Sequence, residues 1–108
     1  MSAEETFNEI CVRLAQRPGV QQRKAFSSPG LRVGGKVFAM LVRGELVVKL
    51  PAERCAELVQ AGARPFQSGG RPLREWVTIR LADRARWGVL AEEALTNARF
   101  RAGAVIGS

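Results

Sequence analysis

The sequence of 108 residues contains no histidine and no tyrosine, and it has only two cysteines. Histidine is the commonest general base in enzymes and tyrosine can serve as a proton donor, so their absence removes the usual routes to acid–base catalysis. Cys11 and Cys55 form neither a CxxC pair nor a zinc-like spacing, which leaves no redox or metal motif. We therefore expect a protein that is not an enzyme and that uses no metal or other cofactor.

Long apolar runs are also missing. No run approaches the roughly 20 residues that a membrane-spanning helix requires, and residues 1–5 lack the basic start of a secretion signal. We expect a soluble cytoplasmic protein with no membrane partner. In that reducing compartment Cys11 and Cys55 are expected to be buried free thiols, with a disulfide as the less favoured alternative.

The residues that are present describe one basic globular domain. Hydrophobic residues make up 46% of the chain and charged residues 25%, and a chain of this length can build a single core, so we predict one domain over residues 1–108. The net charge is +7, with the bases concentrated in residues 11–49 and 64–86. Such a balance favours a polyanionic partner such as nucleic acid; the alternative is that the charge only keeps the protein soluble.

Apolar periodicity predicts three helices. The first places Phe7 and Leu14 on one face and ends at "RPG" (17–19), because proline cannot continue a helix. The second begins at Pro51 and stops at Gly62. The third is capped by Asp83 and has an inner face that begins at Trp87.

Between the helices the pattern indicates strands. Three strands are expected within residues 31–50, and a fourth at 75–81, with Val77, Ile79 and Leu81 pointing inward and Trp76 outward. Residues 20–30 and 64–72 are polar or rich in glycine and proline, and we expect them to be irregular. The predicted fold is an α+β two-layer domain, in which an antiparallel sheet (a three-strand meander plus the later strand) carries helices on one face.

The register of the meander depends on its two turns. Gly34-Gly35 fits a two-residue hairpin loop, because glycine adopts positive φ without strain. A second two-residue loop at Arg43-Gly44 would pair Phe38 with the charged Lys49, whereas a three-residue loop pairs Leu41 with Glu45. The three-residue loop separates apolar from charged residues better, so we predict that register, with Met40 in the core.

In this register the outer sheet face is unusually apolar. Its predicted residues are Val37, Ala39, Leu41 and Val47, bordered by Arg32, Glu45 and Lys49. A contiguous exposed apolar patch usually marks an interface, so this face is expected to bind a protein partner or a second copy of the chain. The alternative is that residues 102–106 fold over it.

Two segments, "LRVGGKVFAMLVRGELVVKLPAERCAELVQAG" and "GGRPLREWVTI", resemble the TfoX N-terminal domain family and its neighbour, the MmcQ/YjbR group, over roughly residues 7–100. The shared motifs are turns and core positions, with no catalytic constellation among them. The resemblance implies a bacterial cytoplasmic α+β domain. Its best-known members regulate competence genes, and the neighbouring group is described as DNA-binding. Full-length members carry a second, helical domain, which we do not expect within residues 1–108.

Two hypotheses for function follow. The first is a regulatory domain that contacts nucleic acid or a transcription component through a basic hairpin surface, formed by Arg32, Lys36, Arg43, Lys49, Arg71 and Arg74. No aromatic residue alternates with these bases along the chain, so the sequence favours weak electrostatic contact with duplex DNA over stacking of single-stranded bases. The second hypothesis is an interaction or homodimerising domain that uses the apolar sheet face and binds no nucleic acid.

Overall fold

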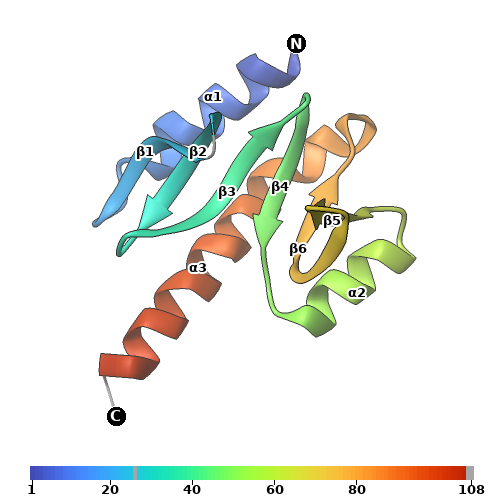
Figure 1. Ribbon diagram of the computed structural model, residues 1–108. Coiled ribbons are helices and arrows are strands. Elements are labelled where there is room, and N and C mark those ends of the chain that lie inside the picture. The colour runs from blue at the N-terminus through green and yellow to red at the C-terminus, as the bar shows by residue number, and fades with distance from the viewer. Residues whose placement is uncertain (26, 107–108) are drawn as a thin grey trace.

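The computed structural model describes residues 1–25 and 27–106 and confirms the α+β fold. Six antiparallel strands form one sheet in the order β1-β2-β3-β4-β6-β5. Helices α1 and α3 lie behind this sheet, and α2 packs beside the β5–β6 end (Figure 1). No helix within these described residues is both long and apolar enough to cross a membrane.

The helices follow the expected pattern. Helix α1 (Ala3–Leu14) begins with a capping box, in which the Ser2 hydroxyl accepts from the Glu5 amide and the Glu5 carboxylate accepts from the Ser2 amide. Helix α2 spans Ala52–Gln60 and α3 spans Trp87–Ile106. A short 3-10 helix, η1 (Leu81–Arg86), precedes α3, so Asp83 lies inside η1 and does not cap α3 as predicted.

The sheet has two strands more than the sequence pattern predicted. Strand β1 (Val20–Ala25) pairs with β2 (Ser28–Val33), and β5 (Arg64–Ser68) pairs with β6 (Arg71–Ile79). Both additional strands lie at the edges of the sheet and are largely exposed, so they carry no clean apolar alternation. Strand β6 ends at Ile79, and Leu81, which was expected inside, is exposed in η1.

The predicted register of β3 (Lys36–Val42) and β4 (Glu45–Lys49) is wrong. The loop between them is the two-residue turn Arg43-Gly44, with both residues at positive φ, and Leu41 pairs with Leu46. The expected clash of Phe38 with Lys49 does not arise. A β-bulge makes Phe38 the extra residue on β3, because β2 pairs through Ala39 and then through Val37. Phe38 and Ala39 therefore both enter the core.

This register decides what lies between the sheet and the helices. Ala39 and Leu41 are buried in the main core with Leu46 and Val48, whereas Met40 points to the opposite, outer face. Strand β2 also lies close to both of its neighbours, β1 and β3, at Gly30. A Cβ there would meet the Arg23 carbonyl oxygen at 3.0 Å and the Ala39 carbonyl oxygen at 3.3 Å, so a side chain would push the strands apart.

Both tryptophans lie where the pattern placed them. Trp87 is fully buried at the start of α3, and Trp76 is half-buried on the outer face of β6, opposite in direction to Val77 and Ile79. Cys11 and Cys55 are buried free thiols, as expected.

We predict that neither cysteine reacts readily with a thiol reagent in the native protein. Burial raises the pKa of Cys11 from 9.0 to about 11 and also raises that of Cys55, so each holds less of the reactive thiolate. Modification by Ellman's reagent at pH 8 should be at least about 100-fold slower than in urea, and it should accelerate as the pH rises from 9 to 11. A thiol that reacts within seconds under native conditions would show that the helix face carrying that cysteine is not packed against the core.

Candidate interaction surface

The charges of the protein are segregated between its two layers. The strands and hairpins, residues 20–49 and 64–79, contain nine of the 17 bases and two of the ten acids. The remaining segments, which include all the helices, contain eight bases and eight acids. The strand segments therefore carry the entire net charge of +7, and the helical segments are neutral.

Strand pairing assigns several bases to the outer face, the side away from α1 and α3. Residues that pair directly across antiparallel strands point to the same face. Arg32 pairs with Val37, and Lys49 pairs with Trp76, and both of these partners belong to the apolar cluster of the outer face. The register thus confirms that Arg32 and Lys49 are outward, whereas Lys36 pairs with Val33, which packs against the main core.

The six predicted contact bases are not one cluster. Arg32, Lys36 and Lys49 lie toward the same end of the sheet, and Lys49 lines a shallow hollow together with Arg74. Arg43 lies at the other end of β3, about 23 Å from Lys36 at the usual rise of a strand. The predicted set therefore divides: Arg32, Lys36, Lys49 and Arg74 lie toward one end, Arg43 lies at the other end of β3, and Arg71 lies opposite Ser68 in the β5–β6 hairpin.

Ion pairing leaves this group unneutralised. Within the described residues, five acids form ion pairs, all with other bases: Glu92 with Arg17, Glu57 and Glu93 with Arg54, Glu45 with Arg64, and Glu75 with Arg101. None of the six predicted bases has a carboxylate within 4.0 Å in this part of the chain. Their charge is therefore available to an external anion.

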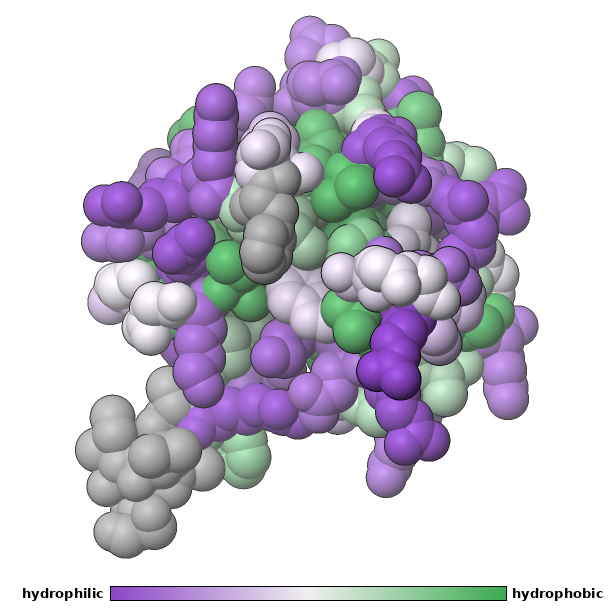
Figure 2. All heavy atoms as spheres, in the orientation of Figure 1, coloured by the Kyte–Doolittle hydropathy of each residue, from purple (hydrophilic) through white to green (hydrophobic). Residues whose placement is uncertain are grey.

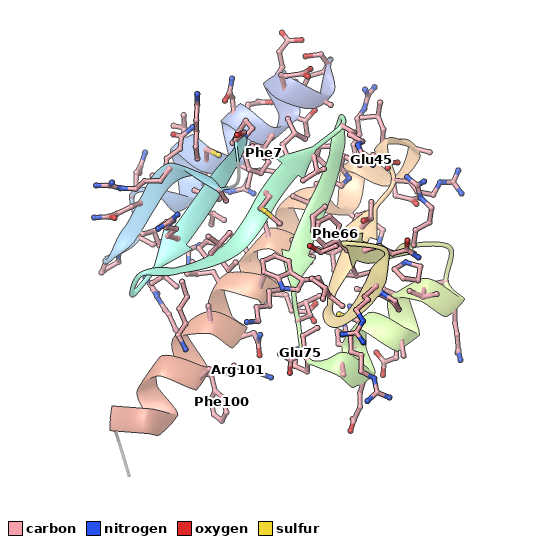
Figure 3. The ribbon with its side chains drawn as sticks, viewed as in Figure 1. Phe7, Glu45, Phe66, Glu75, Phe100 and Arg101 are labelled. Atoms are coloured by element: carbon pink, nitrogen blue, oxygen red, sulfur yellow. The ribbon has the colours of Figure 1, made fainter. Side chains whose placement is uncertain are left out.

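Glu75 illustrates why its neighbourhood stays basic. Its carboxylate accepts two hydrogen bonds from the Arg101 guanidinium, at 3.2 and 2.7 Å, and the side chains of Glu75 on β6 and Arg101 on α3 point toward one another (Figure 3). These hydrogen bonds lower the pKa of Glu75, and the charge of Lys49 contributes a smaller lowering. Since the Glu75 carboxylate pairs with Arg101, it forms no ion pair with Lys49, and the Lys49 ammonium can contact an external anion.

The apolar patch of the outer face differs from the predicted one. Val37 and Val47 do lie there, but Ala39 and Leu41 face the helices, because the two-residue turn and the bulge shift their part of β3. The outer cluster consists of Ala25, Met40, Val47, Val37, Val42, Phe66 and Trp76. In the space-filling view, apolar atoms occupy the middle of this face and hydrophilic side chains surround them (Figure 2).

Two aromatic side chains meet on this face. The rings of Phe66 (β5) and Trp76 (β6) have centroids 6.3 Å apart and a tilt of 54°, and the Lys49 Nζ lies 5.8 Å from the centroid of the Trp76 ring. Phe66 projects from the β5–β6 hairpin in front of the sheet (Figure 3). The two rings border a hollow of about 460 Å³, whose lining is Ala25, Ser28, Met40, Val42, Phe66, Ser68, Leu73 and Trp76.

The sequence pattern missed this aromatic pair because it placed Phe66 in a loop. The indication was nonetheless present: Gly69-Gly70 has the same form as Gly34-Gly35, and both pairs occupy two-residue hairpin turns at positive φ. Recognising the second turn would have predicted β5 and placed Phe66 on a strand beside the one that carries Trp76.

Comparison with protein-family models matches residues 13–98 to the TfoX N-terminal domain. The match covers all six strands, α2 and the first part of α3, but only the last two residues of α1, and it confirms the family expected from the sequence motifs. The expected link to the MmcQ/YjbR group stays a prediction. A search of curated proteins finds no match to this chain.

Proposed function

Because the chain belongs to the TfoX N-terminal domain family, we propose that it is a regulatory, competence-related binding domain, without catalytic activity, whose sheet contacts nucleic acid. The observation that carries this proposal is the segregation of charge: the strands and hairpins hold the whole net charge of +7. A cytoplasmic location, expected from the sequence, would give the domain access to nucleic acid.

The chemistry of the exposed bases supports phosphate contact. Arg71 and Arg74 are exposed on β6 and make no ion pair within the described residues. The planar guanidinium donates two parallel hydrogen bonds to one phosphate, and each neutralised phosphate releases a condensed counterion. Binding of this kind is weakly specific, with a Kd on the order of 10⁻⁴ to 10⁻⁶ M at physiological salt.

We predict that the double substitution Arg71→Ala/Arg74→Ala weakens binding to duplex DNA uniformly across sequences. The slope of log K against log salt should fall by about 1 for each lost phosphate contact. Fluorescence anisotropy of a labelled duplex over a series of salt concentrations measures both effects. The matched control is Arg80→Ala/Arg86→Ala, which removes two other exposed bases, outside the sheet, and should leave the slope unchanged.

Three outcomes would contradict the proposal. Equal losses in both double variants would mean that only total charge matters. Failure of the wild type to bind duplex or single-stranded DNA, even at low ionic strength, would leave the second hypothesis, a protein-interaction or homodimerising domain that uses the outer apolar cluster. Binding to poly-glutamate with the same affinity and salt slope as to DNA would indicate an acidic protein partner instead.

A further inference from the structure

We propose that the hollow beside Phe66 and Trp76 binds an unstacked base of single-stranded nucleic acid. This inference rests on the proposed function and narrows its substrate. The hollow lies on the face to which Arg32 and Lys49 point, and its volume of about 460 Å³ is large enough for a nucleobase. A duplex keeps its bases stacked and paired, so only a strand with free bases can use a concave apolar site of this kind.

The lining suits a flat aromatic group. Phe66 and Trp76 supply two half-buried rings on one side, and Met40 supplies a polarizable thioether from β3. The hydroxyls of Ser28 and Ser68 are polar groups of the lining, in addition to the indole N–H of Trp76, and each hydroxyl can donate to or accept from the edge of a nucleobase. The site thus combines a stacking surface with a few polar groups, as ligand sites usually do.

Small residues make the face concave here. Ala25, Ser28 and Gly30 are small residues of β1 and β2 that lie on the outer face nearest Met40. The β5–β6 hairpin meanwhile shifts register between Pro65 and Phe66, where the ladder is interrupted. Residues from opposite edges of the sheet, Ala25 on β1 and Ser68 on β5, consequently line one hollow.

Two basic residues lie where the phosphates of a bound nucleotide would be. Arg71 pairs directly with Ser68 of the lining, and Lys49 pairs directly with Trp76. The Lys49 ammonium lies over the Trp76 ring in the free protein, a contact that is weak at a solvated site. When a base stacks on this aromatic pair, Lys49 moves from the ring to the adjacent phosphate.

The test compares single-stranded and duplex DNA of equal phosphate number, with wild type, Trp76→Ala, Trp76→Phe and the control Phe100→Ala. Phe100 is a 73% exposed aromatic residue on α3, remote from the hollow. We expect the wild type to bind oligo(dT) more tightly than the duplex. Trp76→Ala should weaken oligo(dT) binding about 10-fold, the loss of one stacked base, and should change duplex binding less than about 2-fold.

Tryptophan fluorescence gives a readout that a loss of stability does not imitate. Oligo(dT) should quench the wild type through Trp76, whereas Trp76→Phe, which keeps an aromatic ring and retains only the buried Trp87, should bind without quenching. Equal affinity for duplex and single strand, with no quenching, would overturn this inference and leave the proposed function standing. Failure of the wild type to bind either oligo(dT) or the duplex would overturn both this inference and the proposed function. Quenching by thymidine monophosphate at the concentration at which oligo(dT) acts would overturn the strand assignment in favour of a free nucleotide.

Discussion

Substituting Trp87 by alanine is expected to lower the free energy of unfolding by about 3–5 kcal/mol, the range typical of large aromatic deletions from a core. Trp87 has 0% of its surface exposed and is the largest fully buried side chain among the described residues. Its indole Nε1 also donates to the Arg80 carbonyl oxygen at 3.2 Å. Removing it leaves a cavity between α3 and the sheet, which accounts for most of the cost, because the Arg80 carbonyl oxygen still accepts from the Asp83 amide at 2.9 Å. Urea unfolding followed by circular dichroism measures the change.

Two further variants make this result interpretable. Phe100→Ala removes an aromatic side chain from the same helix, where the ring points away from the sheet (Figure 3), and should change stability by no more than about 0.5 kcal/mol. Trp87→Phe keeps part of the ring volume and should cost less than Trp87→Ala. Equal, small effects of Trp87→Ala and Phe100→Ala would mean that α3 does not cover the sheet in solution.

The second large effect is expected at Leu41, the residue whose face the sequence pattern and the structure assign differently. Leu41 is 5% exposed in the main core, so Leu41→Ala should cost about 2–5 kcal/mol. Its neighbour Val42 is half-buried on the outer face, and Val42→Ala should cost roughly 1 kcal/mol or less. The difference between the two midpoints of urea unfolding reports which residue faces the helices.

This pair of variants decides between the two turns. With a two-residue turn at Arg43-Gly44, Leu41 pairs with Leu46 and faces the core. With a three-residue turn, Leu41 would point to the outer face and Met40 would replace it. A larger loss from Val42→Ala or Met40→Ala than from Leu41→Ala would support the three-residue turn and contradict the observed register.

The sequence could not settle the register, because the two-residue turn was rejected on the basis of one local conflict. Pairing Phe38 with Lys49 looks unfavourable if β3 is a regular strand. The bulge at Phe38 removes that conflict, but it forms through the pairing of β3 with β2, far enough along the sheet that no property of the β3–β4 turn reveals it. The positions of Ala39 and Leu41 were therefore predicted on the wrong face.

The candidate site, too, was predicted only in part from the sequence. The bases and Trp76 were predicted individually, because charge and strand alternation are visible in a single segment. Their combination was not predicted: Phe66 meets Trp76 only because β5 pairs with β6, and the hollow exists only because opposite sheet edges approach one another. The separation of Arg43 from Lys36 likewise follows from the length of β3.

The sequence by itself determined the family, the α+β class, the core face of α1, the opposite orientations of the two tryptophans and the excess of bases. Each of these depends on composition or on a period within one segment, and local periodicity directly reflects which face is buried. Only the tertiary structure decided the strand register, the two edge strands, the confinement of the net charge to the sheet and the aromatic hollow. These depend on pairing between segments distant in the chain, and the free energies that select one pairing arise from contacts that exist only once the sheet is formed.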